Sequence, residues 1–245
     1  MSPNSTIASI IETDAFTKHL GMFTHPKGAH LTERTQPLGA WLEQRIAYGT
    51  WPYSRSLETT PDTEARLTGS NGAVVEGVNF GSQDYLGLAS HNSIHEAAIR
   101  ALSDFGPHSA ASAILQGNSN LSRRLEAALA EHMQTEHVLL FPTGWAAGFG
   151  AIVGLVRPHD HVVLDQNSHA CLMQGARAAT DRHTFFRHND IADARRKLAR
   201  IRAKDADNAI LVVTEGIFSM DSDSPDISAL QETCREFNAV LLVDV

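Results

Sequence analysis

The chain has 245 residues, 42% of them hydrophobic and 20% charged, a composition typical of a folded globular protein and not of a disordered one. Its formal net charge of −8, without a basic run interleaved with aromatic residues, argues against a nucleic-acid partner. There is no apolar run of membrane-spanning length and no signal-peptide pattern. The two cysteines, Cys171 and Cys234, lack metal-ligand spacing. We therefore expect a cytoplasmic protein without a metal site that acts on a small molecule.

The first third of the chain predicts an arm, a helix and a hairpin. Scattered Gly, Pro, Thr and His residues over positions 1–35 are typical of an arm outside the core. Apolar residues at helical spacing predict a helix over 37–50. Two short strands over 65–79 enclose Gly69-Ser70-Asn71-Gly72, a turn-forming cluster that predicts a β-hairpin.

The next segment predicts a loop, a helix and a second loop. Residues 82–88 form the first loop, and a helix is predicted near 93–104. From Gly106 to Gly117 the chain is rich in Gly, Ser and Ala and has no regular period. Such a stretch is typical of a loop that approaches a ligand closely.

After Asn120 the pattern alternates regularly between helices and strands. Strands are predicted at 137–141, 161–164, 209–214 and 239–244, and helices at 121–133, 146–156, 169–179, 191–202 and 227–237. This alternation indicates an α/β fold with a mainly parallel central sheet flanked by helices.

Polar residues directly after apolar strands are the first candidates for a site, because open α/β sheets bind ligands beyond the carboxyl ends of their strands. The segment Thr143-Gly144-Trp145 begins a helix of small residues. Free N–H groups and the positive dipole end at a helix N-terminus suit a phosphate group. A plain strand-to-helix turn is the alternative interpretation.

Three further candidates follow later strands. His169 opens a predicted helix, where it could stack on a flat ring or simply cap the helix. Glu215 ends an apolar strand and is followed by Ser219, in a segment that could also be an acidic turn. Asp244 interrupts another apolar strand. A buried lone carboxylate is costly unless it pairs with a cation, such as a protonated pyridine or an internal salt-bridge partner.

Taken together and in this order, these segments resemble the α-oxoamine synthases of pyridoxal-phosphate (PLP) fold type I. This family includes 8-amino-7-oxononanoate synthase, glycine acetyltransferase, 5-aminolevulinate synthase and serine palmitoyltransferase. The resemblance runs from about Asn79 to Val245 and includes the boxes Asp84-Tyr85-Leu86-Gly87-Leu88 and Thr214-Glu215-Gly216-Ile217-Phe218-Ser219-Met220-Asp221. The set of boxes is specific, whereas no single box would suffice.

The resemblance implies a PLP enzyme that condenses an amino acid with an acyl thioester, usually acyl-CoA, and releases carbon dioxide to leave an aminoketone. It implies that the N–H groups of Gly144 and Trp145 bind the cofactor phosphate. It also implies that Asp244 keeps the pyridine nitrogen protonated, which makes the ring an electron sink. The expected catalytic residues are His169, Glu215 and Asp244, and the expected cofactor-binding residues are Thr143, Gly144, Trp145, His169, Ser219 and Asp244.

The resemblance also implies the domain organisation and assembly. We expect an N-terminal arm and helix over residues 1–64 and a PLP-binding large domain over 65–245, in a homodimer. In the family, a histidine, the Schiff-base lysine and a C-terminal small domain follow the position of Asp244. None of the four lysines of the chain, Lys18, Lys27, Lys197 and Lys204, matches that lysine. We therefore expect the chain to be part of a longer protein.

Two departures from the family pattern concern residues near the substrate, so the amino acid and the acyl donor stay open. Gln83 stands where the family usually has Asn, and Ala111-Ser112-Ala113 with Ser122 replaces a Gly-Ser-Arg with a following His. An aminotransferase or a lyase of the same fold type is the second enzyme interpretation. A lysine-less, non-catalytic subunit of a heteromeric synthase is the third.

Overall fold

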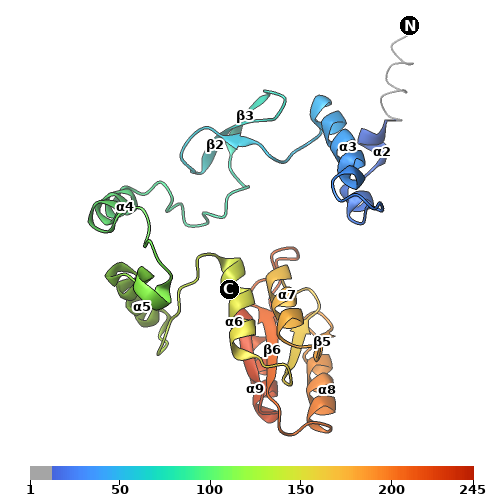
Figure 1. Ribbon diagram of the computed structural model, residues 1–245, viewed down its shortest axis with the longest axis vertical. Helices are drawn as coiled ribbons and strands as arrows, with labels where there is room; N and C mark the ends of the chain where they lie inside the picture. The colour runs from blue at the N-terminus through green and yellow to red at the C-terminus, as the bar shows by residue number, and fades with distance from the viewer. Residues whose placement is uncertain (1–12) are drawn as a thin grey trace. The chain divides into compact units, whose positions relative to one another are not determined.

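The computed structural model describes residues 13–245 and divides into two compact units, with the boundary between Gly117 and Asn118 (Figure 1). The first twelve residues of the expected arm lie outside the described residues. The expected domain boundary at residues 64 and 65 stays a prediction. None of the helices in the described part of the chain is long and apolar enough to cross a membrane.

The first unit contains short helices and one small antiparallel sheet. Its helical elements are α2 (Asp14–Thr17), η1 (Leu20–Phe23), η2 (Glu33–Thr35), α3 (Gln36–Ala47), α4 (Asn92–Phe105) and the π-helical η3 (Ala113–Gly117). Its strands β1 (Ser56–Leu57), β2 (Glu64–Thr68) and β3 (Val74–Val78) pair in the order β1-β2-β3. The helix expected over 37–50 and the hairpin expected over 65–79 are therefore confirmed, and Gly72 supplies the positive φ (77°) that the turn requires.

Trp41 joins α3 to α2. Trp41 is 3% exposed, and its indole N–H donates to the carbonyl oxygen of Asp14 at 2.9 Å. The guanidinium of Arg45 lies 5.2 Å from the centre of its ring and donates to the carbonyl oxygen of Ala15 at 2.7 Å. The buried ring thus keeps its polar group paired, as a buried tryptophan requires.

The second unit is a three-layer α/β structure. Its helices are α5 (Asn120–Met133), α6 (Gly144–Leu155), α7 (Ala170–Ala179), α8 (Ile191–Arg202) and α9 (Ile227–Glu236). Its strands β4 (His161–Asp165), β5 (His183–Phe186), β6 (Ile210–Glu215) and β7 (Val240–Asp244) form a sheet in the order β5-β4-β6-β7. All three strand pairs are parallel, which confirms the expected parallel sheet.

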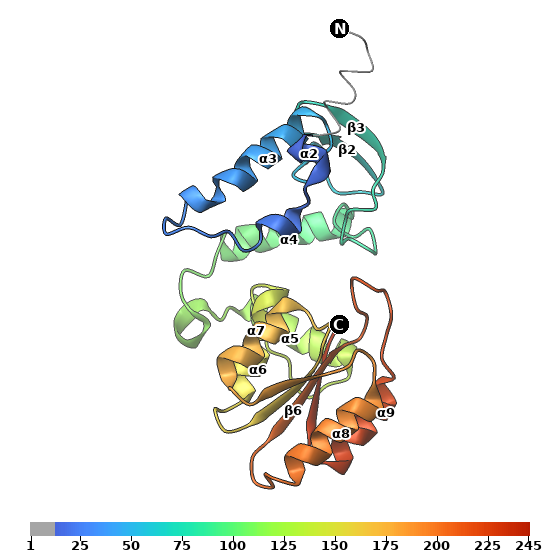
Figure 2. The same ribbon diagram turned by 90° about the vertical axis from the view of Figure 1, so that its right-hand side faces the viewer.

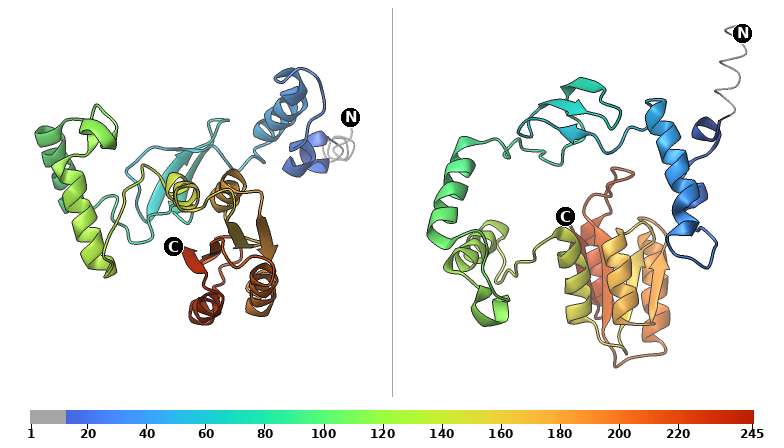
Figure 3. Two further views of the ribbon diagram at one scale, coloured as in Figure 1. Left: turned by 60° about the horizontal axis from the view of Figure 1, so that its bottom comes forward. Right: turned by 45° about the horizontal axis from the view of Figure 1, so that its top comes forward.

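The two faces of this sheet carry separate hydrophobic cores. One face packs against α6 and α7, through strand residues such as Leu164 and Val213. The other packs against α8 and α9, through strand residues such as Val163 and Val212. Figures 2 and 3 show the two pairs of helices on opposite sides of the strands. Because side chains alternate along a strand, each strand contributes to both cores.

The structure differs from the sequence prediction in three strands, one of which is β1 (Ser56–Leu57), a two-residue strand that was not predicted. Residues 137–141 are not a strand; the ring of Phe141 instead lies beside the backbone of Gly150 on α6. An apolar run becomes a strand only where a partner accepts its backbone hydrogen bonds. Conversely, β5 was not predicted, because its four residues, His183 to Phe186, are too few to show a period. Pairing with β4 makes them a strand.

Glycines set the close packing of α6 against α7. A Cβ atom at Gly175 would lie 3.2 Å from both the Cα and the carbonyl oxygen of Phe149, whereas a Cβ at Gly154 on α6 would have no atom within 4 Å. We predict that Gly175→Ala lowers the free energy of unfolding by about 1–3 kcal/mol, because the helices must move apart. The control, Gly154→Ala, should raise it by roughly 0.5–1 kcal/mol through helix propensity. Urea unfolding measures both, and equal effects would contradict the close packing.

Candidate active site

The candidate active site lies at the carboxyl edge of the parallel sheet, where two carboxylates stand side by side. Glu215 ends β6, Asp244 ends β7, and the two residues are paired in register. Each lies two positions after a residue, Val213 or Leu242, that packs in the core under α6 and α7. By the alternation of side chains, both carboxylates therefore face the α6 and α7 side of the sheet.

Glu215 is almost completely buried, with 7% of its surface exposed. Its carboxylate accepts the backbone N–H of His169 at 2.5 Å, which joins the end of β6 to the start of α7. Burial raises the pKa of Glu215, and the neighbouring carboxylate of Asp244 raises it further, against the opposing effect of the hydrogen bond from His169. Two adjacent acids in this position favour a cation between or beside them.

The N-terminus of α6 offers unpaired backbone donors. Thr143 caps the helix, and its hydroxyl accepts the N–H of Ala146 at 3.0 Å. In the described residues, neither the N–H of Gly144 nor that of Trp145 has an acceptor. No atom would lie within 4 Å of a Cβ at Gly144, so the space at this helix end is open. Such an end suits an anion.

The two aromatic rings of the predicted site contact each other. The rings of Trp145 and His169 lie 5.7 Å apart, edge to face at 78°. His169 caps α7: its Nδ1 accepts the N–H of Cys171 at 3.3 Å and lies 2.9 Å from the sulfur of the same residue. Burial, and then the carboxylate of Asp244, raises the pKa of the Cys171 thiol. The start of α7 therefore lies close to the carboxylate pair.

Ser219 lies in a separate hollow, in the loop between β6 and α9. This exposed hydroxyl lines a pocket of about 300 Å³ together with Asn167, Phe218, Met220 and Asp221. None of the other predicted site residues lines this pocket. The structure thus brings Trp145, His169, Glu215 and Asp244 together, and it leaves Ser219 at the neighbouring loop.

Sequence reasoning missed a third carboxylate at the same edge. Asp165 ends β4 and is fully buried, and it accepts hydrogen bonds from His188 and Asn189, which directly follow β5. The reasoning that selected Glu215, an acid at the end of an apolar strand, applies equally to Asp165. The histidine and the asparagine gave no signal because the strand before them was not predicted.

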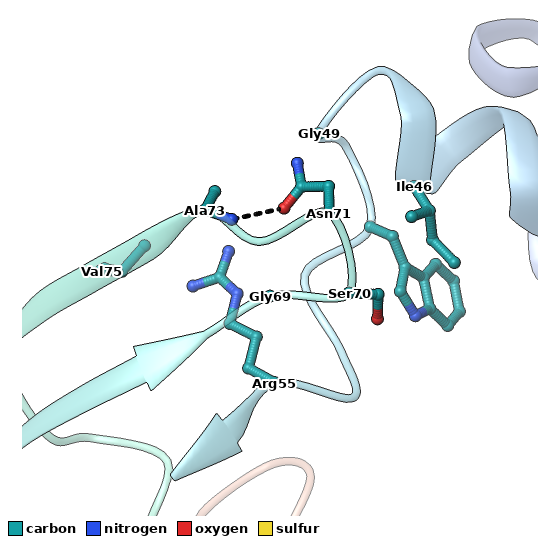
Figure 4. A pocket seen from close by; sticks show the side chains of 9 residues that line it. Ile46, Gly49, Arg55, Gly69, Ser70, Asn71, Ala73 and Val75 are labelled. Atoms are coloured by element: carbon teal, nitrogen blue, oxygen red, sulfur yellow. Dashed lines mark hydrogen bonds between the residues drawn. The ribbon is translucent and has the colours of Figure 1, made fainter. Parts of the chain in front are cut away.

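A pocket in the first unit contains none of the predicted site residues. It lies between the end of α3 and the turn of the β2-β3 hairpin, with Arg55 and Asn71 at its polar side (Figure 4). The amide oxygen of Asn71 accepts the N–H of Ala73 at 3.1 Å within the turn (Figure 4). Among the described residues, the only charged side chain that lines this pocket is the exposed Arg55, and its turn residues are hydrogen-bonded to one another. The pocket is therefore not part of the carboxylate site.

We predict that Glu215→Gln stabilises the protein in the absence of ligand. The native state holds a proton on Glu215 above the ordinary pKa of 4.5, so stability falls as pH rises from that value through the raised one. Glutamine keeps the acceptor for His169 and removes the charge. The melting temperature at pH 7 should rise by roughly 2–4 °C, the shift that a gain of about 1 kcal/mol gives in a domain of this size.

The same measurement at pH 4 should show no gain for Glu215→Gln, because the carboxyl group is then neutral in both states. Glu232→Gln, an exposed acid on α9, is the matched control and should leave the melting temperature unchanged at both values of pH. A gain for Glu215→Gln that persisted at pH 4 would contradict the electrostatic explanation.

Comparisons with known proteins identify the family. Residues 75–245 match the family described as aminotransferase class I and II. Serine palmitoyltransferase from Sphingobacterium spiritivorum is 34% identical over 203 residues, which are 83% of this chain and 49% of that protein. A provisionally named 8-amino-7-oxononanoate synthase from Parvibaculum lavamentivorans is 38% identical over 167 residues, 68% of this chain and 42% of that protein.

Solved structures show the same relationship. Serine palmitoyltransferase from Sphingomonas wittichii superimposes with a TM-score of 0.78 at 30% identity, covering 88% of this chain and 52% of that one. A serine palmitoyltransferase from S. paucimobilis with a bound PLP–myriocin aldimine gives 0.78 at 26% identity, covering 87% and 52%. The chain spans about half the length of these relatives. The expected resemblance to α-oxoamine synthases is confirmed: the chain belongs to the aminotransferase class I and II family and has the PLP-dependent transferase fold type I.

Proposed function

We propose that the protein is a PLP-dependent acyltransferase that joins an amino acid to an acyl thioester of the acyl-CoA class, with loss of carbon dioxide and of the free thiol, to form an aminoketone. One observation supports this most strongly: in residues 13–245, the half-buried carboxylate of Asp244 has no hydrogen-bond or ion-pair partner. It lies beside a second acid, Glu215. Such a carboxylate is costly without a cation, and protonated PLP nitrogen is a cation of the right kind.

The residues at the carboxyl edge fit this cofactor in charge at both of its ends. PLP carries a phosphate at one end and a protonatable ring nitrogen at the other. The unpaired N–H groups of Gly144 and Trp145 suit the phosphate, and Asp244 suits the nitrogen. The ring of His169 contacts that of Trp145, as a residue that stacks on the cofactor ring would.

In this proposal each side chain has a defined task. Bound PLP supplies an electron sink for a carbanion at the α-carbon of the amino acid. Asp244 would hold the proton on the ring nitrogen, and His169 would stack on the ring and exclude water from it. Glu215 fixes the start of α7, and with it His169, through the backbone hydrogen bond. Ser219, on the neighbouring loop, would donate its hydroxyl hydrogen to the ring oxygen of the bound cofactor.

We also propose that the Schiff-base lysine comes from outside these 245 residues. Lys197 lies on α8 and Lys204 just after it, and α8 packs on the face of the sheet opposite to that of Asp244. Neither lysine suits a cofactor held by Asp244. We further propose that the enzyme is cytoplasmic and works as a homodimer, with small-molecule substrates and no nucleic acid.

The reaction is tested by product analysis with the full-length protein. We predict that an amino acid plus an acyl-CoA, in the presence of PLP, yields carbon dioxide and an aminoketone detected by mass spectrometry. Borohydride reduction with PLP should add the mass of one phosphopyridoxyl group. Release of an oxoacid or of ammonia without any need for acyl-CoA would instead support an aminotransferase or a lyase. Absence of phosphopyridoxyl addition would support a non-catalytic subunit.

The role of Asp244 is tested separately from turnover. We predict that Asp244→Asn still binds PLP but slows exchange of the substrate α-proton with deuterated water by at least about 100-fold, because the ring nitrogen loses its charge partner. Proton NMR of the amino acid measures the exchange. Asp207→Asn, at an exposed acid before β6, should exchange at the wild-type rate. Normal exchange in Asp244→Asn would overturn the assignment.

A further inference from the structure

A second polar network lies at the carboxyl edge of the sheet, on the opposite face from Glu215. Asp165 ends β4 two positions after Val163, which packs in the core under α8 and α9. Its side chain therefore faces that side, and it is 0% exposed. The proposed reaction uses no residue of this network, so the buried charge of Asp165 must have another role.

Asp165 is fully satisfied by donors from two loops. Oδ1 accepts the backbone N–H of Asn167 and faces Nδ1 of His188, both at 2.9 Å. Oδ2 accepts the backbone N–H of Asn189 at 2.8 Å. A buried carboxylate with three such partners is held rigidly, so His188 is anchored to the end of β4.

His188 connects this anchor to the loop between β6 and α9. Its Nε2 lies 3.0 Å from Oδ2 of Asp223, which also accepts the side-chain N–H of Asn189 at 2.9 Å. The imidazole thus faces a carboxylate with each nitrogen. A neutral imidazole donates from one nitrogen only, whereas the imidazolium donates from both. The geometry therefore favours the charged form.

The same loop carries Ser219. The N–H of Phe218 donates to the carbonyl oxygen of Asp223 at 2.9 Å, and the N–H of Ser222 donates to the carbonyl oxygen of Phe218 at 2.8 Å. These bonds close residues 218–223 into a turn around Ser219. The ring of Phe218 is buried and meets the ring of His188 edge to face at 4.5 Å. The position of the turn thus depends on His188 at two points.

We propose that His188 is a positioning residue, whose imidazolium ties Asp223 to the buried Asp165 and so holds the 218–223 turn, and Ser219 within it, in place for the cofactor. The part concerning Ser219 rests on the proposed function; the tie between the two carboxylates does not. Ser219 itself is exposed and has no hydrogen bond within residues 13–245, so its placement comes from the turn.

This tie depends on pH. Burial opposes the charge on His188, but the hydrogen bonds to Asp165 and Asp223 raise its pKa above the ordinary value. Asp221 adds a third carboxylate nearby. One carboxylate oxygen of Asp221, one of Asp223 and a ring nitrogen of His188 all lie within 4.8 Å of one another. The charged chain neighbours Arg187 and Asp190 pair with each other. The tie is complete below pH 6.5 and is lost as pH rises through the raised pKa.

Hydrogen exchange of the Phe218 and Ser222 amides in the full-length protein tests the tie. We expect His188→Gln to speed their exchange at pH 6 by about tenfold or more, the factor that corresponds to a loss of 1.4 kcal/mol. Asp223→Asn, at a half-exposed position, should have a smaller effect in the same direction. His183→Gln is the matched control, because His183 is half-buried beside Phe185 but bonds only to a backbone carbonyl.

In the wild type, exchange at these two amides, corrected for the intrinsic effect of pH, should accelerate between pH 6 and pH 9. In His188→Gln this acceleration should vanish. Unchanged exchange in both His188→Gln and Asp223→Asn, or equal acceleration in His183→Gln, would overturn the tie. Exchange in the wild type that did not accelerate with pH would also overturn the tie.

PLP titration, followed by absorbance, tests the consequence for the cofactor. We expect the dissociation constant for PLP to rise about tenfold in His188→Gln and to stay unchanged in His183→Gln. Faster exchange with unchanged PLP affinity would overturn the positioning of Ser219. A wild type that binds no PLP but shows the exchange results would overturn the proposed function and leave the tie supported.

Discussion

The alternation of side chains along three neighbouring parallel strands organises everything at the carboxyl edge of this protein. β4, β6 and β7 all end in an acid, and the register of the sheet brings these ends to one edge. The parity of each position then decides its face: Glu215 and Asp244 turn toward α6 and α7, and Asp165 turns toward α8 and α9. A single-residue shift in one of these strands would turn its acid to the other face and dismantle the group to which that acid belongs.

The two groups of acids solve the same electrostatic problem in different ways. Asp165 is buried with all its partners inside the chain, namely two backbone N–H groups and His188. Such a charge is compensated and can serve as an anchor. Asp244 has no hydrogen-bond or ion-pair partner in the described residues, and its neighbour Glu215 accepts only the backbone N–H of His169. Two adjacent carboxylates with a single hydrogen-bond donor between them form a site that favours a cationic group.

The helices supply the complementary charge. The close contact of α6 with α7, which Gly175 permits, places the N-terminal ends of both helices at the edge where the carboxylates emerge, as the contact between Trp145 and His169 shows. An anion is favoured at the helix ends and a cation at the acids. A ligand with a phosphate at one end and a protonated ring at the other matches this pattern, which links the fold to the proposed chemistry.

The sequence by itself determined the α/β class, the parallel sheet, the longer helices of both units, and the residue types of the site. These follow from period, from apolar runs and from acids at strand ends, all of which are local properties. Only the tertiary structure decided which acid faces which side, because facing depends on strand register. It also decided that residues 137–141 are no strand and that β5 is one, because strands exist only through their partners. For the same reason His188 came to notice only in the structure: it acts through Asp165, 23 positions away, and Asp223, 35 positions away, and no sequence pattern records contacts at that separation.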